Sequence, residues 1–179
     1  MKVLSLIEPW ATLVKEKKKF IETRSWQTSY RGGLYIHAGS KKINKNDAHT
    51  IELLKLIPDV PMGYGHILCK CKLVDCVYMD EEFLKYIQQD KQEFLCGEYS
   101  LGRYAWILED VEPLQQPIPA KGHLNIWDYE PEEKLKGVNT MNIVLLKDHE
   151  RIEEGLRSLT EELHDGSFFY CKMCKVYCK

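Results

Sequence analysis

The sequence predicts an α+β protein built from a small mixed sheet or barrel with helices at its ends. Segments with strand-like and helix-like patterns follow one another at irregular spacing, and short glycine-containing turns join them. A doubly wound parallel sheet would need a more regular alternation of strands and helices. Of the 179 residues, 44% are hydrophobic and 29% are charged, which is typical of a globular domain with a real core.

The first part of the chain predicts three strands and one helix. Residues 3–7 are apolar enough for a buried strand. Pro9 can open a helix, because its missing N–H has no cost there, and the helix ends in lysines that suit its C-terminal dipole. Residues 20–26 are rich in β-branched and aromatic side chains, and residues 34–38 alternate along the chain, so we expect strands at both.

The middle of the chain alternates helices with longer strands. Asn46 or Asp47 can cap a helix that Pro58 ends, and glycines at 63 and 65 precede a long alternating segment. The predicted elements are a helix at 47–57, a strand at 66–77, a helix at 80–95, a strand at 104–111 and an extended, proline-containing segment at 113–123.

The C-terminal part predicts an extension to the main domain. Residues 141–146 are expected to form a strand, and residues 148–164 an amphipathic helix with its apolar residues on one face. A cysteine-bearing tail follows. We therefore expect a first domain over residues 1–140 and a C-terminal extension over residues 141–179.

The most informative polar residues lie at the second predicted strand. Lys19, Glu22 and Arg24 place an ammonium, a carboxylate and a guanidinium within six positions. A carboxylate can accept hydrogen bonds from a base edge, and a guanidinium can hold a phosphate, so the set suits recognition of RNA or a nucleoside. Strand alternation puts Glu22 and Arg24 on one face and Thr23 on the other. The alternative is a structural cluster of ion pairs at the helix-to-strand junction.

Aromatic and basic residues nearby extend this candidate site. Stacking of a base on an aromatic ring contributes about 1–3 kcal/mol, and a second guanidinium could clamp phosphate. Trp10 and Trp26 could instead fill the core, His37 could be an ordinary hydrogen-bonded strand histidine, and Ser40 with Lys41 could be an ordinary loop. The additional candidates are Trp10, Trp26, Tyr30, Arg31, His37, Ser40 and Lys41.

Charge is distributed unevenly along the chain. Residues 1–45 carry ten lysines or arginines and three glutamates, whereas the rest carries fifteen basic and twenty-four acidic residues. A basic first quarter could mark a patch for a polyanion, or it could be a set of solvated lysines. The acidic remainder leaves a third option, an adaptor that binds protein partners.

Seven cysteines indicate a reducing compartment, the cytoplasm or nucleus. The sequence shows no secretory signal and no apolar run of the roughly 20 residues that cross a bilayer, so we expect no membrane partner. No cofactor is required by the predicted site. The tail could hold a structural zinc ion, since CxxC is half of a zinc site, or it could carry only reactive thiols. The zinc candidates are Cys171, Cys174, Cys178 and His164.

Several motifs together resemble the ASCH domain family, which is itself similar to the PUA fold of pseudouridine synthase and archaeosine transglycosylase. In the family's GxKxxExR pattern, Lys17 stands at the glycine position. Lys19, Glu22 and Arg24 match the pattern. The resemblance covers about residues 3–130, and it is carried by Leu4–Ala11, Lys19–Trp26, Tyr30–Gly32, Ile36–Ala38, Gly65–Ile67, Val74–Cys76, Gly102–Trp106, Lys121–Gly122 and Trp127.

The resemblance implies a PUA-like mixed barrel with flanking helices and a cleft beside Lys19. Relatives of this fold bind RNA or modified bases there, so binding is the first expectation. One branch deacetylates N4-acetylcytidine derivatives, using a threonine where this chain has Glu22, and nuclease activity has been proposed in the family. A hydrolase is therefore the alternative, with Glu22 acting as base on a water and Lys19 holding the developing charge. Because Thr23 is expected on the opposite face of the strand, no side-chain hydroxyl would stand where the deacetylase branch uses its threonine.

Overall fold

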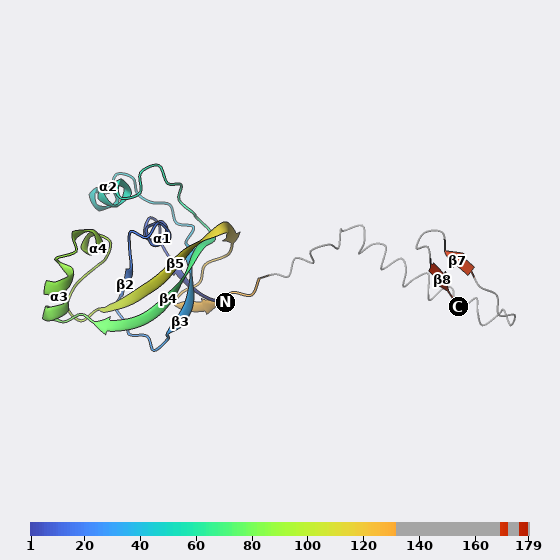
Figure 1. Ribbon diagram of the computed structural model, residues 1–179. Helices are drawn as coiled ribbons and strands as arrows, with labels where there is room; N and C mark the ends of the chain where they lie inside the picture. Colours follow the sequence, from blue (N-terminus) through green and yellow to red (C-terminus); the bar gives the residue numbers. More distant parts are fainter. Residues whose placement is uncertain (132–168, 172–175, 179) are drawn as a thin grey trace. The chain divides into compact units, whose positions relative to one another are not determined.

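The computed structural model describes residues 1–131, 169–171 and 176–178. The chain divides into two compact units, Met1–Glu130 and Pro131–Lys179. The first unit contains the mixed sheet and all the helices described below (Figure 1). The second contains a pair of short antiparallel strands, β7 (Phe169–Cys171) and β8 (Val176–Cys178). The strand and helix predicted at 141–146 and 148–164 lie outside the described residues.

A six-stranded sheet forms the frame of the first unit. Its strand order is β2-β5-β4-β3-β1-β6. β1 and β3 pair in parallel, whereas all the other neighbouring strands pair antiparallel. This is the α+β, PUA-like arrangement that the sequence predicts, with β2 and β6 at the two edges. The strands are β1 (Lys2–Leu6), β2 (Ile21–Arg24), β3 (Gly32–Ala38), β4 (His66–Tyr78), β5 (Tyr104–Pro119) and β6 (Ile126–Asp128).

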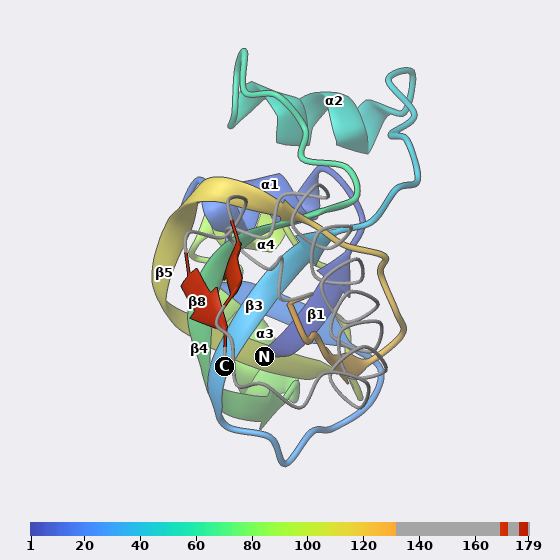
Figure 2. The ribbon, with the colours of Figure 1, turned by 90° about the vertical axis from the view of Figure 1, so that its right-hand side faces the viewer.

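The sheet is strongly curved, so that it forms a half-barrel (Figure 2). The β4–β5 pairing shifts register at three places, and the β3–β4 pairing shifts between Ile36 and His37. Register irregularities of this kind bend the strand and increase its twist. Asp110, with a φ of 51°, lies in the left-handed region within β5. β5 continues to Pro119, well beyond the predicted end at 111, because past Leu108 only β4 pairs with it and prolines are tolerated at a free edge.

The first unit has four short helices, of which the first in the chain packs against the strands. They are α1 (Trp10–Lys15), α2 (Ala48–Lys55), α3 (Glu81–Ile87) and α4 (Lys91–Leu95). The carboxylates of Asp47, Asp80 and Asp90 each accept a hydrogen bond from a backbone N–H in the first turn that follows. The single helix predicted at 80–95 is therefore wrong, because Asp90 caps a new helix and divides the segment into α3 and α4. No helix among the described residues is long and apolar enough to cross a membrane.

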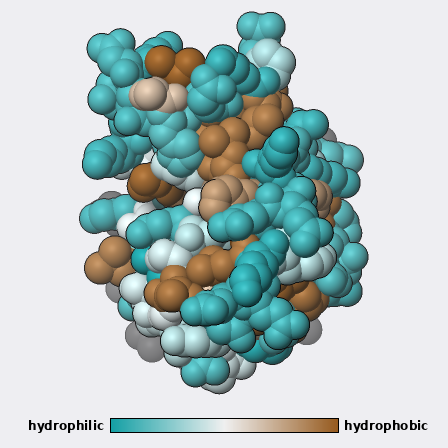
Figure 3. All heavy atoms as spheres, turned by 90° about the vertical axis from the view of Figure 1, so that its left-hand side faces the viewer, coloured by the Kyte–Doolittle hydropathy of each residue, from teal (hydrophilic) through white to brown (hydrophobic). Residues whose placement is uncertain are grey.

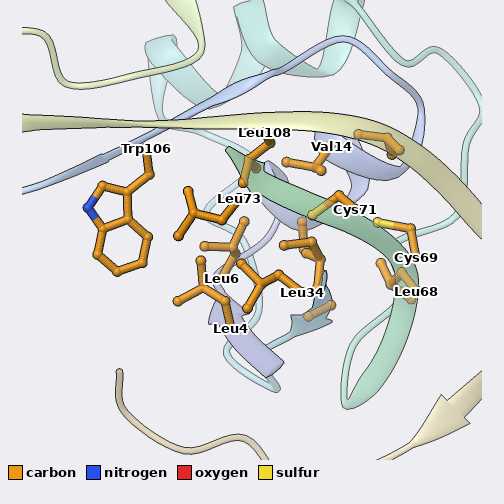
Figure 4. Packing of buried hydrophobic residues seen from close by; sticks show 14 of the residues in the cluster. Leu4, Leu6, Val14, Leu34, Leu68, Cys69, Cys71, Leu73, Trp106 and Leu108 are labelled. Atoms are coloured by element: carbon orange, nitrogen blue, oxygen red, sulfur yellow. The ribbon is translucent and has the colours of Figure 1, made fainter. Parts of the chain in front are cut away.

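The core lies between the concave side of the sheet and α1. Leucines from β1, β3, β4 and β5 meet there, and the indole of Trp106 closes one end (Figure 4). A smaller cluster joins α1 to α2 and to the end of α4 through Leu13, Leu53 and Cys96. Both ribbon views accordingly place α2 beyond α1 from the sheet (Figures 1 and 2). On the face that carries α2, α3 and α4, hydrophobic side chains lie in several groups separated by hydrophilic ones (Figure 3).

Replacing a core leucine should destabilise the protein far more than replacing a surface leucine. Leu34 is fully buried and Leu101 is 60% exposed. We expect Leu34→Ala to lower the free energy of unfolding by about 2–5 kcal/mol, because the substitution leaves a cavity. Leu101→Ala should change the free energy by less than about 0.5 kcal/mol. Urea denaturation followed by circular dichroism measures both, and equal losses would contradict this account of the core.

Candidate functional site

The short edge strand β2 organises the candidate site. Its residues Ile21–Arg24 pair with β5 on one side. On the other side, the carboxylate of Glu93 in α4 accepts hydrogen bonds from the backbone N–H groups of Phe20, at 2.6 Å, and Ile21, at 3.2 Å. Tyr99 donates a third hydrogen bond, at 3.0 Å, to the same carboxylate. Glu93 therefore takes the place of a neighbouring strand at the beginning of β2.

Lys19 lies two residues before the start of β2 and is fully buried. Its ammonium donates hydrogen bonds to the carbonyl oxygens of Ile21 and Cys96, the latter at 2.9 Å, and lies 3.5 Å from the Glu22 carboxylate. An ammonium has three N–H donors, and this arrangement offers three acceptors. The charge of Lys19 is thus compensated by its surroundings, which a buried charge requires.

Glu22 lies between two cations. Its second oxygen is 3.1 Å from Nε of Arg24, although Nε has no hydrogen-bond partner, so this contact is an ion pair without an aligned hydrogen bond. Arg24 donates from Nη2 to the Ser5 carbonyl at 3.3 Å and lies 5.9 Å above the Trp106 ring centroid. That distance is within the range of a cation–π interaction. Arg24 therefore bridges β2 to β1.

A second arginine, the residue that precedes β5, approaches the same region. Arg103 donates from Nη2 to the Thr23 carbonyl at 3.4 Å and lies 3.1 Å from the Glu98 carboxylate. Its Nε, like that of Arg24, is buried without a hydrogen-bond partner. Two guanidinium groups therefore reach one region of the surface from two neighbouring strands.

These groups line one cavity of about 680 Å³. The volume lies within the range of small-molecule sites. Three cations and two carboxylates are part of its wall, together with the Trp10 and His49 rings, whose centroids are 6.1 Å apart. The charged residues of the wall are Lys19, Glu22, Arg24, Glu98 and Arg103.

The cavity lies at the open seam of the half-barrel. β6 pairs with residues 2–4 of β1 only, so the edge of β1 at Ser5 has no strand beside it among the described residues. The guanidinium of Arg24 crosses from β2 to this free edge. The sheet topology therefore leaves an opening between β1 and β2, and polar side chains line that opening.

The structure brings some of the predicted residues together and separates others. Lys19, Glu22, Arg24 and Trp10 line the seam cavity. Trp26 and Tyr30 instead line a separate hollow of about 580 Å³. The ring of Trp26 packs edge-on against Trp106, with centroids 4.7 Å apart.

Arg31 lines none of the described cavities. Its guanidinium forms an exposed ion pair with Asp75 at 3.0 Å and donates to the carbonyls of Thr28 and Tyr30. β2 ends at Arg24, so the alternation that would have carried later residues into the cavity stops there.

His37, Ser40 and Lys41 line a neighbouring cavity of about 670 Å³. His37 is buried, and its two ring nitrogens lie 3.1 Å from the Ser5 hydroxyl and 3.1 Å from the Ala120 carbonyl. Burial lowers the pKa of His37, which favours the neutral ring. This is the hydrogen-bonded strand histidine that the sequence offered as an alternative to stacking.

Thr23 also lines the seam cavity, and strand alternation still places its side chain on the face of β2 opposite Glu22. The Thr23 hydroxyl accepts a hydrogen bond at 3.0 Å from the backbone N–H of Glu98.

Sequence reasoning did not single out Glu93, Glu98 or Arg103. Arg103 stands within one of the motifs that resemble the ASCH family, which was the available signal. Glu93 carried no local signal, because its partners Phe20 and Ile21 are more than seventy positions away in the sequence.

The zinc prediction for the tail stays a prediction. Cys171 and Cys178 lie in β7 and β8, where they pair with Val176 and Phe169. Cys174 and His164 lie outside the described residues. In the described part of the chain, no group of three or more histidine, cysteine or carboxylate side chains could hold a metal ion.

Comparison with known proteins identifies the family. The sequence profile of the ASCH domain matches residues 4–143. The chain belongs to the ASCH domain family. It is 28% identical over 131 residues to activating signal cointegrator 1 of Homo sapiens and 27% identical over 131 residues to that of Mus musculus. Each match covers 69% of this chain but only 21% of the relative, so the chain spans about a fifth of their length.

Solved ASCH structures also resemble the chain. The ASCH protein of Zymomonas mobilis aligns with a TM-score of 0.47 and 17% identity, covering 75% of this chain and 91% of that one. A mutant of the same Zymomonas mobilis protein aligns with a TM-score of 0.43 and 16% identity, covering 75% of this chain and 94% of that one.

The stability of this ASCH domain should depend on the protonation of Glu93. Burial raises the pKa of Glu93 above its ordinary value of 4.5. Between 4.5 and the raised pKa, the folded chain holds a proton that the unfolded chain has lost, so this contribution to stability falls as the pH rises. Glu93→Gln removes the titration.

Urea denaturation from pH 4 to pH 8 tests this expectation. The free energy of unfolding of the wild type relative to Glu93→Gln should be highest at the acidic end and decline as the pH rises. Glu82→Gln, in the exposed first turn of α3, is the matched control and should track the wild type. A difference between wild type and Glu93→Gln that is constant with pH would contradict the expectation.

Proposed function

We propose that the seam cavity between β1 and β2 binds RNA or a modified nucleoside. The observation that carries the proposal is the placement of Glu22 between Lys19 and Arg24 on the wall of an open cavity. A carboxylate there can accept hydrogen bonds from the N–H groups of a base, as carboxylates do from cytosine N4. The guanidinium groups beside it can hold phosphate oxygens.

Unused donor capacity supports this proposal over a purely structural role. A guanidinium has five N–H donors. Arg24 makes one hydrogen bond, to Ser5, and the Nε atoms of Arg24 and Arg103 have no hydrogen-bond partner. A closed structural cluster would be expected to satisfy such groups. The side chains of Arg24 and Arg103 are 26% and 21% exposed, so their outer Nη donors can meet an anionic or base-bearing ligand.

The cysteines support a reducing compartment, and we propose the cytoplasm or nucleus. Cys69, Cys71, Cys76 and Cys96 are buried free thiols. Burial raises the pKa of Cys71 to about 12 and that of Cys96 to about 11. Cys71 and Cys96 are therefore protonated at neutral pH and unreactive, so they pack as small apolar groups.

Binding of RNA should depend on Arg24 and not on Arg31. We expect Arg24→Ala to weaken binding of an RNA pool at least about tenfold, because a hydrogen bond to a charged group contributes roughly 1.5–3 kcal/mol. The salt dependence should also decrease, by about 0.7 in the slope of log affinity against log salt. Fluorescence anisotropy at several salt concentrations measures both.

Arg31→Ala is the matched control. It also removes one guanidinium, but its ion pair with Asp75 is on the exposed surface outside the cavity. We expect its affinity to equal that of the wild type. Equal weakening by both substitutions would indicate a general charge effect and contradict the proposed site. If the wild type binds no RNA pool and no nucleoside, the adaptor with protein partners is the remaining option.

The second candidate function is hydrolysis of an acylated base in the same cavity. The observation that favours it is that Thr23 lines the cavity; its hydroxyl accepts a hydrogen bond from the Glu98 backbone N–H and keeps its own proton to donate. Lys19 donates to two backbone carbonyls and contacts Glu22, so it acts as a fixed cation rather than a proton acceptor. Glu22 would then be the base that activates a water.

An absorbance assay with N4-acetylcytidine separates the two functions. The binding proposal predicts no conversion by the wild type. If the wild type converts N4-acetylcytidine and Glu22→Gln does not, hydrolysis replaces binding as the proposed function. The glutamine keeps the size of the side chain and removes its basicity. The variant Glu109→Gln, on the exposed surface of β5, controls for the loss of one carboxylate.

A further inference from the structure

A second cavity adjoins the seam cavity and has nearly the same size. It measures about 670 Å³, and it shares Ser5, Gly39, His123 and Leu124 with the first. Each cavity alone lies within the range that accommodates a small-molecule ligand. A single nucleoside in the seam cavity would therefore leave the second cavity empty.

The two cavities differ in the charges of their walls. The seam cavity mixes cations with Glu22 and Glu98, whereas the second contains Lys41 and Lys121 and no carboxylate. Among the described residues, neither lysine lies within ion-pair distance of an acidic side chain. Exposed, uncompensated ammonium groups attract phosphate without selecting a base. The mixed wall of the first cavity suits a base, and the cationic wall of the second suits phosphate.

The segment of residues 120–125, which follows β5, contributes to the walls of both cavities. The N–H of Ala120 donates to the Gly65 carbonyl at 3.0 Å, and the Ala120 carbonyl lies 3.1 Å from Nε2 of His37. Because a carbonyl can only accept, Nε2 carries the proton, and Nδ1 of the neutral ring accepts from the Ser5 hydroxyl at 3.1 Å.

Gly122 holds this segment close to the sheet. A Cβ atom at this position would lie 2.6 Å from Cε1 of His37 and 3.0 Å from the Ser5 hydroxyl oxygen. Only glycine allows this approach without displacing the imidazole. Trp127 donates to the same hydroxyl at 3.1 Å and so fixes the other side of Ser5. The two cavities therefore keep a fixed position relative to each other.

We propose that the second cavity is a phosphate subsite, and that the ligand is a single-stranded oligonucleotide with one base in the seam cavity and a neighbouring phosphate against Lys41 and Lys121. This inference rests on the proposed function, because it needs a base in the seam cavity. It goes further by naming a strand rather than a free nucleoside as the ligand. Ser40, beside Lys41, offers a hydroxyl donor to the same phosphate.

Affinity should therefore increase when a phosphate is added to the nucleoside. For each of the four standard ribonucleosides, the probes are the nucleoside, its 3′- and 5′-monophosphates and its homotetramer. We expect at least one tetramer to bind at least about tenfold tighter than its nucleoside, since two charged contacts are added. In the variant carrying Lys41→Ala and Lys121→Ala, this gain should disappear while the nucleoside affinity stays the same.

Two further variants control for charge and chemistry. The variant carrying Lys85→Ala and Lys91→Ala also removes two exposed lysines, from α3 and the start of α4, and should bind the tetramer as the wild type does. The variant carrying Lys41→Arg and Lys121→Arg keeps both charges and should retain the gain. The slope of log affinity against log salt for the tetramer should decrease by about 1.4 in the alanine variant only.

The outcomes separate this inference from the proposal on which it rests. Equal affinity of nucleoside and tetramer, or no effect of the alanine variant, would overturn the phosphate subsite and leave the seam cavity proposal standing. If a nucleoside monophosphate bound as tightly as the tetramer, the phosphate subsite would stand, but the proposal of a single-stranded oligonucleotide as the ligand would be overturned. If the wild type bound none of these probes, the strand proposal would be overturned; if it also bound no RNA pool and no modified nucleoside, the seam cavity proposal would be overturned as well.

Discussion

The buried ammonium of Lys19 is the interaction on which the candidate site depends. A buried charge that loses a partner destabilises a protein by about 3–5 kcal/mol, so its three acceptors must all be held in place. Those acceptors come from Ile21 in β2, Cys96 after α4, and Glu22. The ammonium thus ties the edge strand to the helical segment and fixes one side of the Glu22 carboxylate. Glu93 reinforces the same junction from α4.

The open seam of the half-barrel explains why a cavity forms at this junction. β2 is only four residues long, and β6 covers only the first half of β1. An exposed strand edge invites unwanted pairing, and proteins often cover such edges with helices, loops or charged groups. Here α4 and the guanidinium of Arg24 occupy the edges, and they leave a polar hollow between them. The fold and the candidate site therefore have one structural cause.

Local patterns in the sequence predicted the strands, because strand alternation and helix caps depend on residues close in the chain. Lys19, Glu22 and Arg24 were identifiable for the same reason. The sequence could not place Trp26 or Arg31, since nothing local shows that β2 ends at Arg24. It also could not join distant segments, so the role of Glu93 appears only once α4 packs against β2.

Backbone amide NMR with an added oligonucleotide tests the central claim most directly. The account predicts chemical-shift changes concentrated at residues 21–24, 96–98 and 120–125, which surround the seam cavity and its neighbour. The exposed ion pair of Arg31 and Asp75 should show no change. Changes that avoid these three segments and gather on another surface would contradict the account, as would a spectrum that does not respond at saturating ligand.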